Sequence, residues 1–284
     1  MSPTSRRTFL TAAGTAAAVP LLGLPGTARA AGRTVSADEG DGDHYPSNTA
    51  LYADTSLVEG KDYGRRYRRH AVTDDDLAGR AGFVRTTILA LHGGGIETGT
   101  SELCLAVAGY HPADLTVTPA GGPVYDYWMF EALRATDNGD LHVTATHCDD
   151  GVARSLCAGS LNAVSLHGCT ASQAGLESTA QAVLVGGRNA AFRRLLLEEF
   201  AVAGIRAVDA SAHPTLGGVD PDNIANRTLL GMGAQLETTT ALRAAMFTDN
   251  TRAGRKTSTT PLFWSFTNAV RAATGRLEAT QVIA

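Results

Sequence analysis

The chain has 284 residues, of which 44% are hydrophobic and 18% are charged, a globular composition that excludes collagen-like, coiled-coil and wholly disordered chains. Its formal net charge is −4, and beyond residue 30 it carries 21 basic against 28 acidic residues, so general affinity for nucleic acid is not expected. A polyanionic partner stays open, because a local cluster of arginines can bind one whatever the net charge of the whole surface.

The first thirty residues have the layout of an export signal. Arg6 and Arg7 precede an apolar stretch, and Ala28-Arg29-Ala30 has the small residues of a cleavage site. The paired arginines resemble a twin-arginine signal, so we expect residues 1–30 to be removed and the protein to be secreted. The alternative is a membrane anchor, but glycine and proline interrupt the apolar stretch, and no stable anchor is expected.

The rest of the chain divides at residue 47. Residues 31–47 are rich in glycine and acidic residues and are predicted to be a flexible linker. Residues 48–284 show no internal repeat, so we predict one domain there. In an exported protein an even number of cysteines is compatible with disulfides, and buried free thiols are the alternative. The chain has four: Cys104, Cys148, Cys157 and Cys169.

Apolar runs of strand length alternate with helical segments along this domain. The predicted strands are 86–91, 115–118, 141–146, 162–166, 182–185, 205–208 and 229–236. The predicted helices are 101–109, a segment capped by Asn189 and stopped by Gly204, 239–247 and 261–274. This alternation predicts an α/β fold with a mixed, largely parallel sheet and helices on both faces.

Two predicted strands end in the same tripeptide, Leu-His-Gly. Its histidines are His92 and His167, 75 positions apart in the sequence. Ligand sites in open α/β sheets gather beyond the carboxyl ends of the strands, so we expect the two histidines to converge there. A single strand-end histidine is more often structural, and the prediction therefore depends on what accompanies the pair.

Two carboxylates accompany the histidines. Three glycines follow His92 and allow the backbone to turn, so that Glu97 is presented back toward His92. A third predicted strand ends in Glu237. Two imidazoles and one carboxylate leave a coordination position open on zinc, as a hydrolytic site requires, and a second, non-ligating glutamate can take the proton from water. The two histidines and the two glutamates together favour a zinc site.

The residues around these positions also form a recognisable set of motifs, in one order along the chain. They are His92-Gly-Gly-Gly-Ile-Glu97-Thr-Gly-Thr-Ser-Glu102, Asp140-Leu-His-Val-Thr-Ala-Thr-His147, Ser165-Leu-His-Gly168, Val185-Gly-Gly187, Asn223-Ile-Ala-Asn-Arg227 and Gly233-Ala-Gln-Leu-Glu237 with Leu242-Arg243. From about Asn48 to Phe247 the chain resembles the phage- and bacillus-type poly-γ-glutamate hydrolase family. The resemblance implies a zinc hydrolase with a carboxypeptidase A-like fold that cuts γ-glutamyl amide bonds in an anionic polymer or peptide.

The resemblance also implies individual roles. His92, Glu97 and His167 would be ligands of Zn²⁺, and Glu237 would be the general base, in agreement with the residues themselves. We expect an arginine to hold a substrate carboxylate through two hydrogen bonds, and Arg227 beside Asn226 is the first candidate. A structural ion pair is the alternative for Arg227. The sequence indicates no oligomeric state.

Three other functions stay open. His-Gly-Gly-Gly also occurs as the oxyanion-hole motif of α/β-hydrolases, but the chain has no Gly-x-Ser-x-Gly nucleophile motif. Cys169, two residues after His167, is a conceivable nucleophile of a cysteine hydrolase. A non-catalytic exported binding protein is the third candidate, and Glu237 argues against it because binding alone needs no general base.

Several other polar residues have a structural interpretation. Glu102 lies in the first turn of a predicted helix, where a carboxylate favours the helix dipole. We expect His142 to face the sheet interior and His147 to lie in a loop. The run Arg65–Arg69 is expected to form a solvated face, offset by nearby aspartates.

Overall fold

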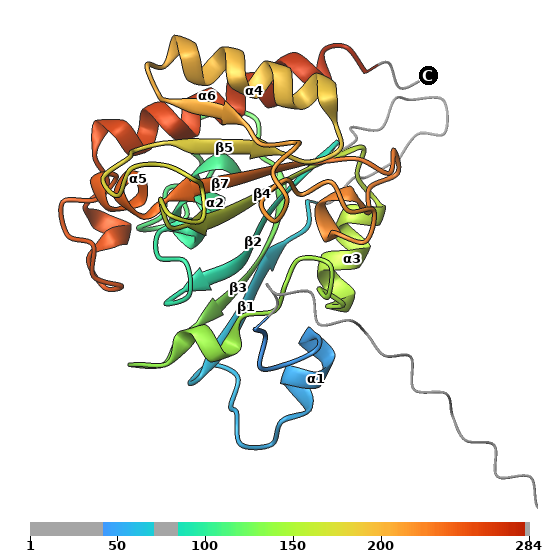
Figure 1. Cartoon of the computed structure of the whole chain (residues 1–284), viewed down its shortest axis with the longest axis vertical. Helices are drawn as coiled ribbons and strands as arrows, with labels where there is room; N and C mark the ends of the chain where they lie inside the picture. The colour runs from blue at the N-terminus through green and yellow to red at the C-terminus, as the bar shows by residue number, and fades with distance from the viewer. Residues whose placement is uncertain (1–41, 71–84, 282–284) are drawn as a thin grey trace, which may run out of the picture. The chain divides into compact units, whose positions relative to one another are not determined.

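The computed structural model describes residues 42–70 and 85–281 (Figure 1). The predicted export signal and all of the predicted linker up to residue 41 lie outside these ranges. Among the helices of the described ranges, none is long and apolar enough to cross a membrane.

A seven-stranded sheet runs through the described part of the chain, in the order β1-β3-β2-β4-β7-β5-β6. Its strands are β1 (Tyr63–Arg68), β2 (Thr86–Gly94), β3 (Asp126–Ala132), β4 (Asn162–Cys169), β5 (Val183–Gly186), β6 (Ala207–Asp209) and β7 (Ala234–Thr239). Strands β3, β2, β4 and β7 are parallel neighbours, and β6 is parallel to β5. Strands β1 and β5 are antiparallel to β3 and β7. The sheet is therefore mixed and largely parallel, as predicted.

Helices cover both faces of this sheet (Figure 1), which confirms the predicted fold class. One face, called the α2 face here, packs against α2 (Thr100–Val107), α4 (Ala190–Val202) and α6 (Pro261–Glu278). The opposite face, the α3 face, packs against α1 (Asn48–Ala53) and α3 (Gly151–Ala158). The short helix α5 (Thr240–Ala245) follows β7, and the 3-10 turns are η1 (Asn138–Leu141), η2 (Ile224–Asn226) and η3 (Arg255–Thr257).

Helix α4 shows how local sequence builds these layers. The Asn189 side chain accepts a hydrogen bond from the Phe192 amide, a cap that is worth about 1 kcal/mol. Phe192, Leu196 and Phe200 recur at helical spacing, and all three are fully buried against the sheet. The predicted helix and its cap are confirmed.

Alternation along the strands decides which side chains meet at the site. In β4, Val164 and Leu166 belong to the core on the α2 face, whereas Ala163 belongs to the core on the α3 face. Successive side chains point to opposite faces of a strand, so Ser165 and His167 lie on the α3 face. The same rule places Gln235 and Glu237 of β7 on that face, near the carboxyl ends of the parallel strands.

Two predicted strands are wrong, and two strands of the structure were not predicted. Residues 115–118 form a loop in which Leu115 has a positive φ of 63°, so the predicted strand is wrong. The strand predicted at 141–146 is also wrong, because a 3-10 turn and an irregular segment occupy these positions. Strands β1 and β3 were not predicted. Strand β3 is buried on both faces, so it lacks the alternation of polar and apolar residues that marks a half-buried strand.

Candidate metal centre

The loop after β2 carries Glu97 back to His92. The Glu97 amide donates to the His92 carbonyl at 2.8 Å, which closes a tight turn. Gly94 has a φ of +67°, and a side chain on it would collide with the Ala132 carbonyl of β3. The glycine run therefore permits the turn that the sequence predicts, and it brings the Glu97 carboxylate within 2.9 Å of His92 Nδ1.

Three potential metal-donor groups, two imidazoles and one carboxylate, converge at the carboxyl ends of β2 and β4. His92 Nδ1 lies 3.1 Å from His167 Nδ1 and 2.9 Å from Glu97 Oε1, and His167 Nδ1 lies 3.9 Å from Glu97 Oε2. Ligands about 2.0–2.1 Å from a tetrahedral zinc ion are roughly 3.3 Å from one another. The spacing and chemistry of these three donors therefore fit a zinc ion, and the histidines converge as expected.

Both imidazoles are held from their far side. His92 Nε2 lies 2.9 Å from the Val143 carbonyl, and His167 Nε2 lies 2.7 Å from Ser165 Oγ. A carbonyl accepts only from an N–H, so Nε2 of His92 carries a proton and Nδ1 is the ring nitrogen that faces Glu97 and His167. Such outer partners orient histidine ligands in metal sites. We call His92, Glu97, His167 and Glu237 the His–Glu cluster.

Charge is divided within the His–Glu cluster. Burial opposes ionisation of Glu97, but the facing His92 ring and its hydrogen bond hold the pKa of Glu97 at about 2. Burial lowers the pKa of His167 to about 3. Burial also disfavours charged His92, whereas the Glu97 carboxylate raises the pKa of His92 above its ordinary value. An ionised carboxylate thus lies beside a neutral His167 at neutral pH, and both are the protonation states that metal ligation needs.

Glu237 lies beside these three potential metal ligands but makes no hydrogen bond to any of them. It is paired with His167 across β4 and β7, and Gln235 Nε2 donates to its Oε1 at 2.9 Å. Gln235 in turn accepts from Asn223 Nδ2 at 2.7 Å. Burial, reinforced by the charge of Glu97, raises the pKa of Glu237 to about 8. A buried carboxyl group with a raised pKa suits proton transfer near neutral pH.

The structure adds a residue pair that the sequence did not suggest. The His142 ring stacks on the His92 ring with centroids 3.8 Å apart, and a donor atom of His142 lies within 4.8 Å of those of His92 and Glu97. Asp43 Oδ1 lies 2.5 Å from His142 Nδ1, and Asp43 Oδ2 accepts from the Thr144 amide. The expectation that His142 faces the sheet interior is therefore wrong. His142 lies in the irregular segment predicted as a strand, which explains the error.

The residues predicted to bind substrate have other partners. Arg227 Nη2 pairs with Asp222 at 2.8 Å, and its side chain is 46% exposed. The Asn226 side chain is saturated by main-chain groups: it donates to the Gly218 and Asp220 carbonyls and accepts from the Gly233 and Arg188 amides. The structure does not bring either residue into contact with the His–Glu cluster, and their roles stay predictions.

Another arginine lies much closer to the cluster. The buried guanidinium of Arg243 lies over Gly168, where any side chain would overlap it. Its Nε and Nη1 donate to the Thr98 and Thr238 carbonyls, and its Nη2 has no hydrogen-bond or ion-pair partner among the described residues. Burial lowers the pKa of Arg243, and the charge of Glu97 opposes that shift. The adjacent Leu-Arg of the sequence motif is the signal that marks this position.

Two further sequence alternatives are settled by burial. The four cysteines are free and buried, which matches the free-thiol alternative. Burial raises the pKa of the Cys169 thiol to about 12, so this thiol is protonated at neutral pH and poorly suited to act as a nucleophile.

Glu102 is buried and accepts from Arg255 at 3.2 Å, an ion pair that a surface helix cap would not need.

Comparison with known proteins gives a consistent set of matches. A family model described as poly-gamma-glutamate hydrolase matches residues 69–269. The chain is 34% identical over 182 residues to SPbeta prophage-derived UPF0714 protein YoqZ of Bacillus subtilis (strain 168), covering 64% of this chain and 59% of that protein. It is 30% identical over 183 residues to UPF0714 protein YndL of the same organism, covering 64% of each. The chain thus spans less than two thirds of the length of either relative.

Solved structures show the same likeness in three dimensions. The structure of a bacteriophage poly-gamma-glutamate hydrolase is 30% identical, with a TM-score of 0.67, covering 84% of this chain and 100% of that one. A zinc-free apo structure of YndL is 26% identical, with a TM-score of 0.65, covering 85% of this chain and 100% of that one. The matched region contains every member of the His–Glu cluster.

Proposed function

The chain belongs to the poly-gamma-glutamate hydrolase family, a family of hydrolases, and from this premise we propose that it is a zinc-dependent enzyme that cleaves γ-glutamyl amide bonds of poly-γ-glutamate or a related anionic peptide. The observation that carries the proposal is the convergence of His92 Nδ1, His167 Nδ1 and the Glu97 carboxylate beside the buried Glu237. The zinc-free form recorded for YndL supports zinc as the metal in this group of proteins.

In this proposal His92, Glu97 and His167 hold the metal. When bound, zinc lowers the pKa of water from 15.7 toward about 7 and polarises a carbonyl group. The outer contacts of His92 with Val143 O and of His167 with Ser165 Oγ fix the ring orientations before any ligand arrives. Such pre-orientation avoids reorganisation of the site during the reaction.

Glu237 has the position and chemistry of the general base. It accepts the proton of the attacking water and later delivers that proton to the leaving amine. Gln235 Nε2 holds its Oε1, so the Oε2 atom is the one available for proton transfer. The chain Asn223–Gln235–Glu237 makes Asn223 and Gln235 positioning residues, since both act through the carboxylate of Glu237.

Arg243 is the best-placed residue to hold a negatively charged group of the substrate. Two of its nitrogens are fixed by main-chain carbonyls and Nη2 is left for a ligand, which is the pre-organised state of a guanidinium clamp. Its hydrogen-bond partners Thr98 and Thr238 directly follow Glu97 and Glu237 in the chain, so Arg243 lies close to the cluster. In this proposal Arg243 takes the role that the sequence suggested for Arg227.

Export is part of the same proposal. The paired arginines of the first thirty residues support secretion by a twin-arginine-type route, after which residues 48–284 act as the catalytic domain. A polymer substrate outside the cell is consistent with this location. Measurement of the N-terminal residue of the protein recovered from the medium tests it, and cleavage after Ala30 is the expected result.

The decisive test of function is the size distribution of poly-γ-glutamate incubated with the protein. Three incubations are compared: the protein as purified, the protein with a chelator, and the chelated protein after zinc is restored. We expect shortening of the polymer that the chelator abolishes and zinc restores. Polymer that stays intact in every incubation contradicts the proposed substrate, and shortening that persists in chelator contradicts the proposed metal.

A further inference from the structure

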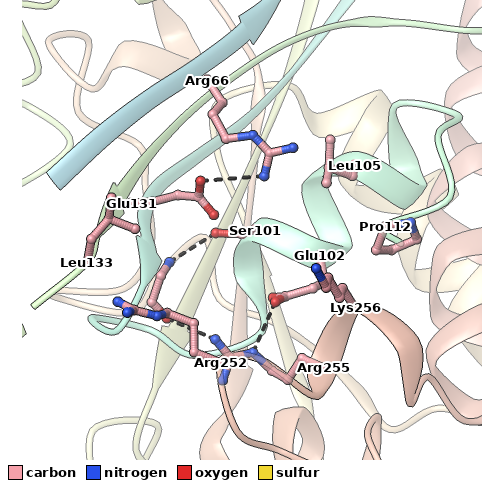
Figure 2. A pocket seen from close by; sticks show the side chains of 11 residues that line it. Arg66, Ser101, Glu102, Leu105, Pro112, Glu131, Leu133, Arg252, Arg255 and Lys256 are labelled. Atoms are coloured by element: carbon pink, nitrogen blue, oxygen red, sulfur yellow. Dashed lines mark hydrogen bonds and ion pairs between the residues drawn. The ribbon is translucent and has the colours of Figure 1, made fainter. Parts of the chain in front are cut away.

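A charged cavity lies beside helix α2 and is lined by residues of α2, β1 and β3 (Figure 2). Its volume is about 230 Å³, several times the roughly 30 Å³ share of a water molecule in the liquid. The charged residues that line it are Arg66, Glu102, Glu131, Arg252, Arg255 and Lys256, and we call it the basic cavity. Helix α2 forms one wall, and Gly94, two residues after His92, forms part of another.

Positive charge exceeds negative charge in the basic cavity. Arg255 is buried and pairs with Glu102 at 3.2 Å, and Arg66 pairs with Glu131 at 3.5 Å. These contacts are visible in Figure 2. Arg252 and Lys256 are exposed, and neither has an ion-pair or hydrogen-bond partner for its side chain within the described ranges. Two cations are thus left at the mouth of the cavity, which favours an anionic ligand.

A second observation restricts the ligand further. Glu102 is only 8% exposed, and its Oε2 atom has no hydrogen-bond partner among the described residues, although Oε1 accepts from Arg255. A carboxylate oxygen can only accept a hydrogen bond when ionised, so it is satisfied by an N–H or O–H donor. A buried polar atom left without a partner costs about 1–3 kcal/mol. The ligand that fits therefore combines a negative charge with a nearby donor.

A γ-linked glutamate residue has this combination on one carbon atom. Its Cα carries both the free α-carboxylate and the amide N–H of the main chain, whereas an α-linked glutamate has its free carboxylate at the end of the side chain. The carboxylate would face Arg252 and Lys256, while the N–H would face Glu102. Charge-assisted hydrogen bonds of this kind are the stronger class.

The basic cavity and the His–Glu cluster lie on opposite faces of the sheet. Helix α2 and the side chains of Arg66 and Glu131 line the cavity on the α2 face, whereas His167 and Glu237 lie on the α3 face. The loop that follows β2 separates the two sites, because Gly94 lines the cavity and Glu97 belongs to the cluster. A polymer bound at both sites would therefore pass over this loop at the carboxyl edge of the parallel strands.

We propose that the basic cavity is a binding subsite for one γ-glutamyl residue of the polymer, on the face of the sheet opposite the cluster. This inference rests on the proposed function, because the polymer must be the substrate. The subsite would increase the affinity for long chains without taking part in the chemistry. It would also favour γ-linked over α-linked glutamate.

The test is the double variant Arg252→Ala/Lys256→Ala, whose two side chains are exposed and whose loss leaves the core unchanged. We expect the KM for poly-γ-glutamate to rise about tenfold while kcat stays within about twofold, since a tenfold change corresponds to one charge-assisted contact. The matched control is Arg188→Ala/Arg194→Ala, which removes two exposed arginines, one after β5 and one in α4, neither of which lines the basic cavity. An unchanged KM in the first variant, or an equal rise in the control, overturns the inference.

Binding of short oligomers separates this inference from the proposed function. Titration calorimetry with a γ-linked glutamate pentamer and an α-linked pentamer measures affinity without turnover, in the metal-free full chain. We expect the wild type to prefer the γ-linked pentamer and the Arg252→Ala/Lys256→Ala variant to lose most of that preference. If the wild type leaves the polymer intact, the proposed function fails. If it cleaves the polymer but the variant keeps the preference, the subsite alone fails.

Discussion

The His–Glu cluster and the basic cavity lie on opposite faces of the sheet, and they differ in how their polar side chains are held. In the cluster, neighbouring groups hold the His92, His167 and Glu97 side chains through hydrogen bonds from fixed directions. In the basic cavity, Arg252 and Lys256 lack such partners within the described ranges. Groups that do chemistry must be oriented beforehand, whereas groups that bind a flexible polymer keep their hydrogen bonds for the ligand.

The largest effect is expected from a change inside the cluster. His167→Ala removes one of three converging donors, so we expect loss of bound zinc and at least a roughly thousandfold fall in turnover. Zinc content by elemental analysis and polymer cleavage measure the two effects. His111→Ala is the control, because His111 follows α2 and should leave both unchanged. Full zinc content in His167→Ala would contradict the proposal that His167 is a zinc ligand.

A change at Arg243 tests which arginine binds the substrate. Arg243→Ala removes a buried guanidinium whose Nη2 is proposed to hold substrate, and we expect kcat/KM to fall roughly a hundredfold with zinc retained. Arg227→Ala is the matched variant, because this arginine is half exposed and paired with Asp222. Its kcat/KM should stay within about twofold of wild type. The reverse order of effects would restore Arg227 as the substrate residue.

Gly168→Ala tests the same contact from the other side. The new methyl group would overlap the Arg243 guanidinium, so it must displace that side chain from its place beside the cluster. We expect a roughly tenfold lower kcat/KM, smaller than that of Arg243→Ala because the charge is kept. The double variant should be no worse than Arg243→Ala alone. Additive losses in steady-state kinetics would show that the two residues act separately.

The smallest effect concerns Asp43, which extends the fixed network outward through His142. Burial raises the pKa of Asp43, but the His142 and Thr144 hydrogen bonds outweigh it and hold the value at about 2, against an ordinary 3.8. A depressed carboxyl pKa contributes stability above pH 4 that disappears as the pH falls toward 2.

Urea unfolding of the wild type and Asp43→Asn at several pH values measures this contribution. The variant should be less stable by about 1–2 kcal/mol at pH 6, and the difference should shrink toward zero by pH 2. Asp137→Asn, an exposed aspartate with a local hydrogen bond to Thr136, serves as the control and should show little difference. A difference that is independent of pH would exclude the charge of Asp43 as its source.

The sequence predicted the fold class and the convergence of the cluster, because both follow from local patterns. Strand-length apolar runs that alternate with helices imply a largely parallel sheet, and parallel strands that end in His-Gly bring their histidines to one edge. The glycine run next to His92 likewise predicted the return of Glu97. Each of these inferences needs only a few neighbouring residues and the geometry of a strand.

What the sequence did not predict depends on contacts between distant segments. His142 stacks on His92 from an irregular segment, and Asp43 reaches it across 99 positions. The Nη2 atom of Arg243 is available only because Thr98 and Thr238 hold the other nitrogens. No local periodicity encodes such contacts. For the same reason the sequence suggested Arg227 as the substrate-binding arginine. Arg227 is near Glu237 in the sequence, but in the structure it pairs with Asp222.

The most direct test of the account is Glu237→Gln, with zinc content and turnover measured on the same preparation. We expect the zinc content of the wild type, because Glu237 is not one of the three converging donors, and a fall in kcat of roughly 10²–10⁴-fold, because the general base is lost. A variant that loses its zinc as His167→Ala does, or one that keeps wild-type turnover, would contradict the division of roles within the cluster.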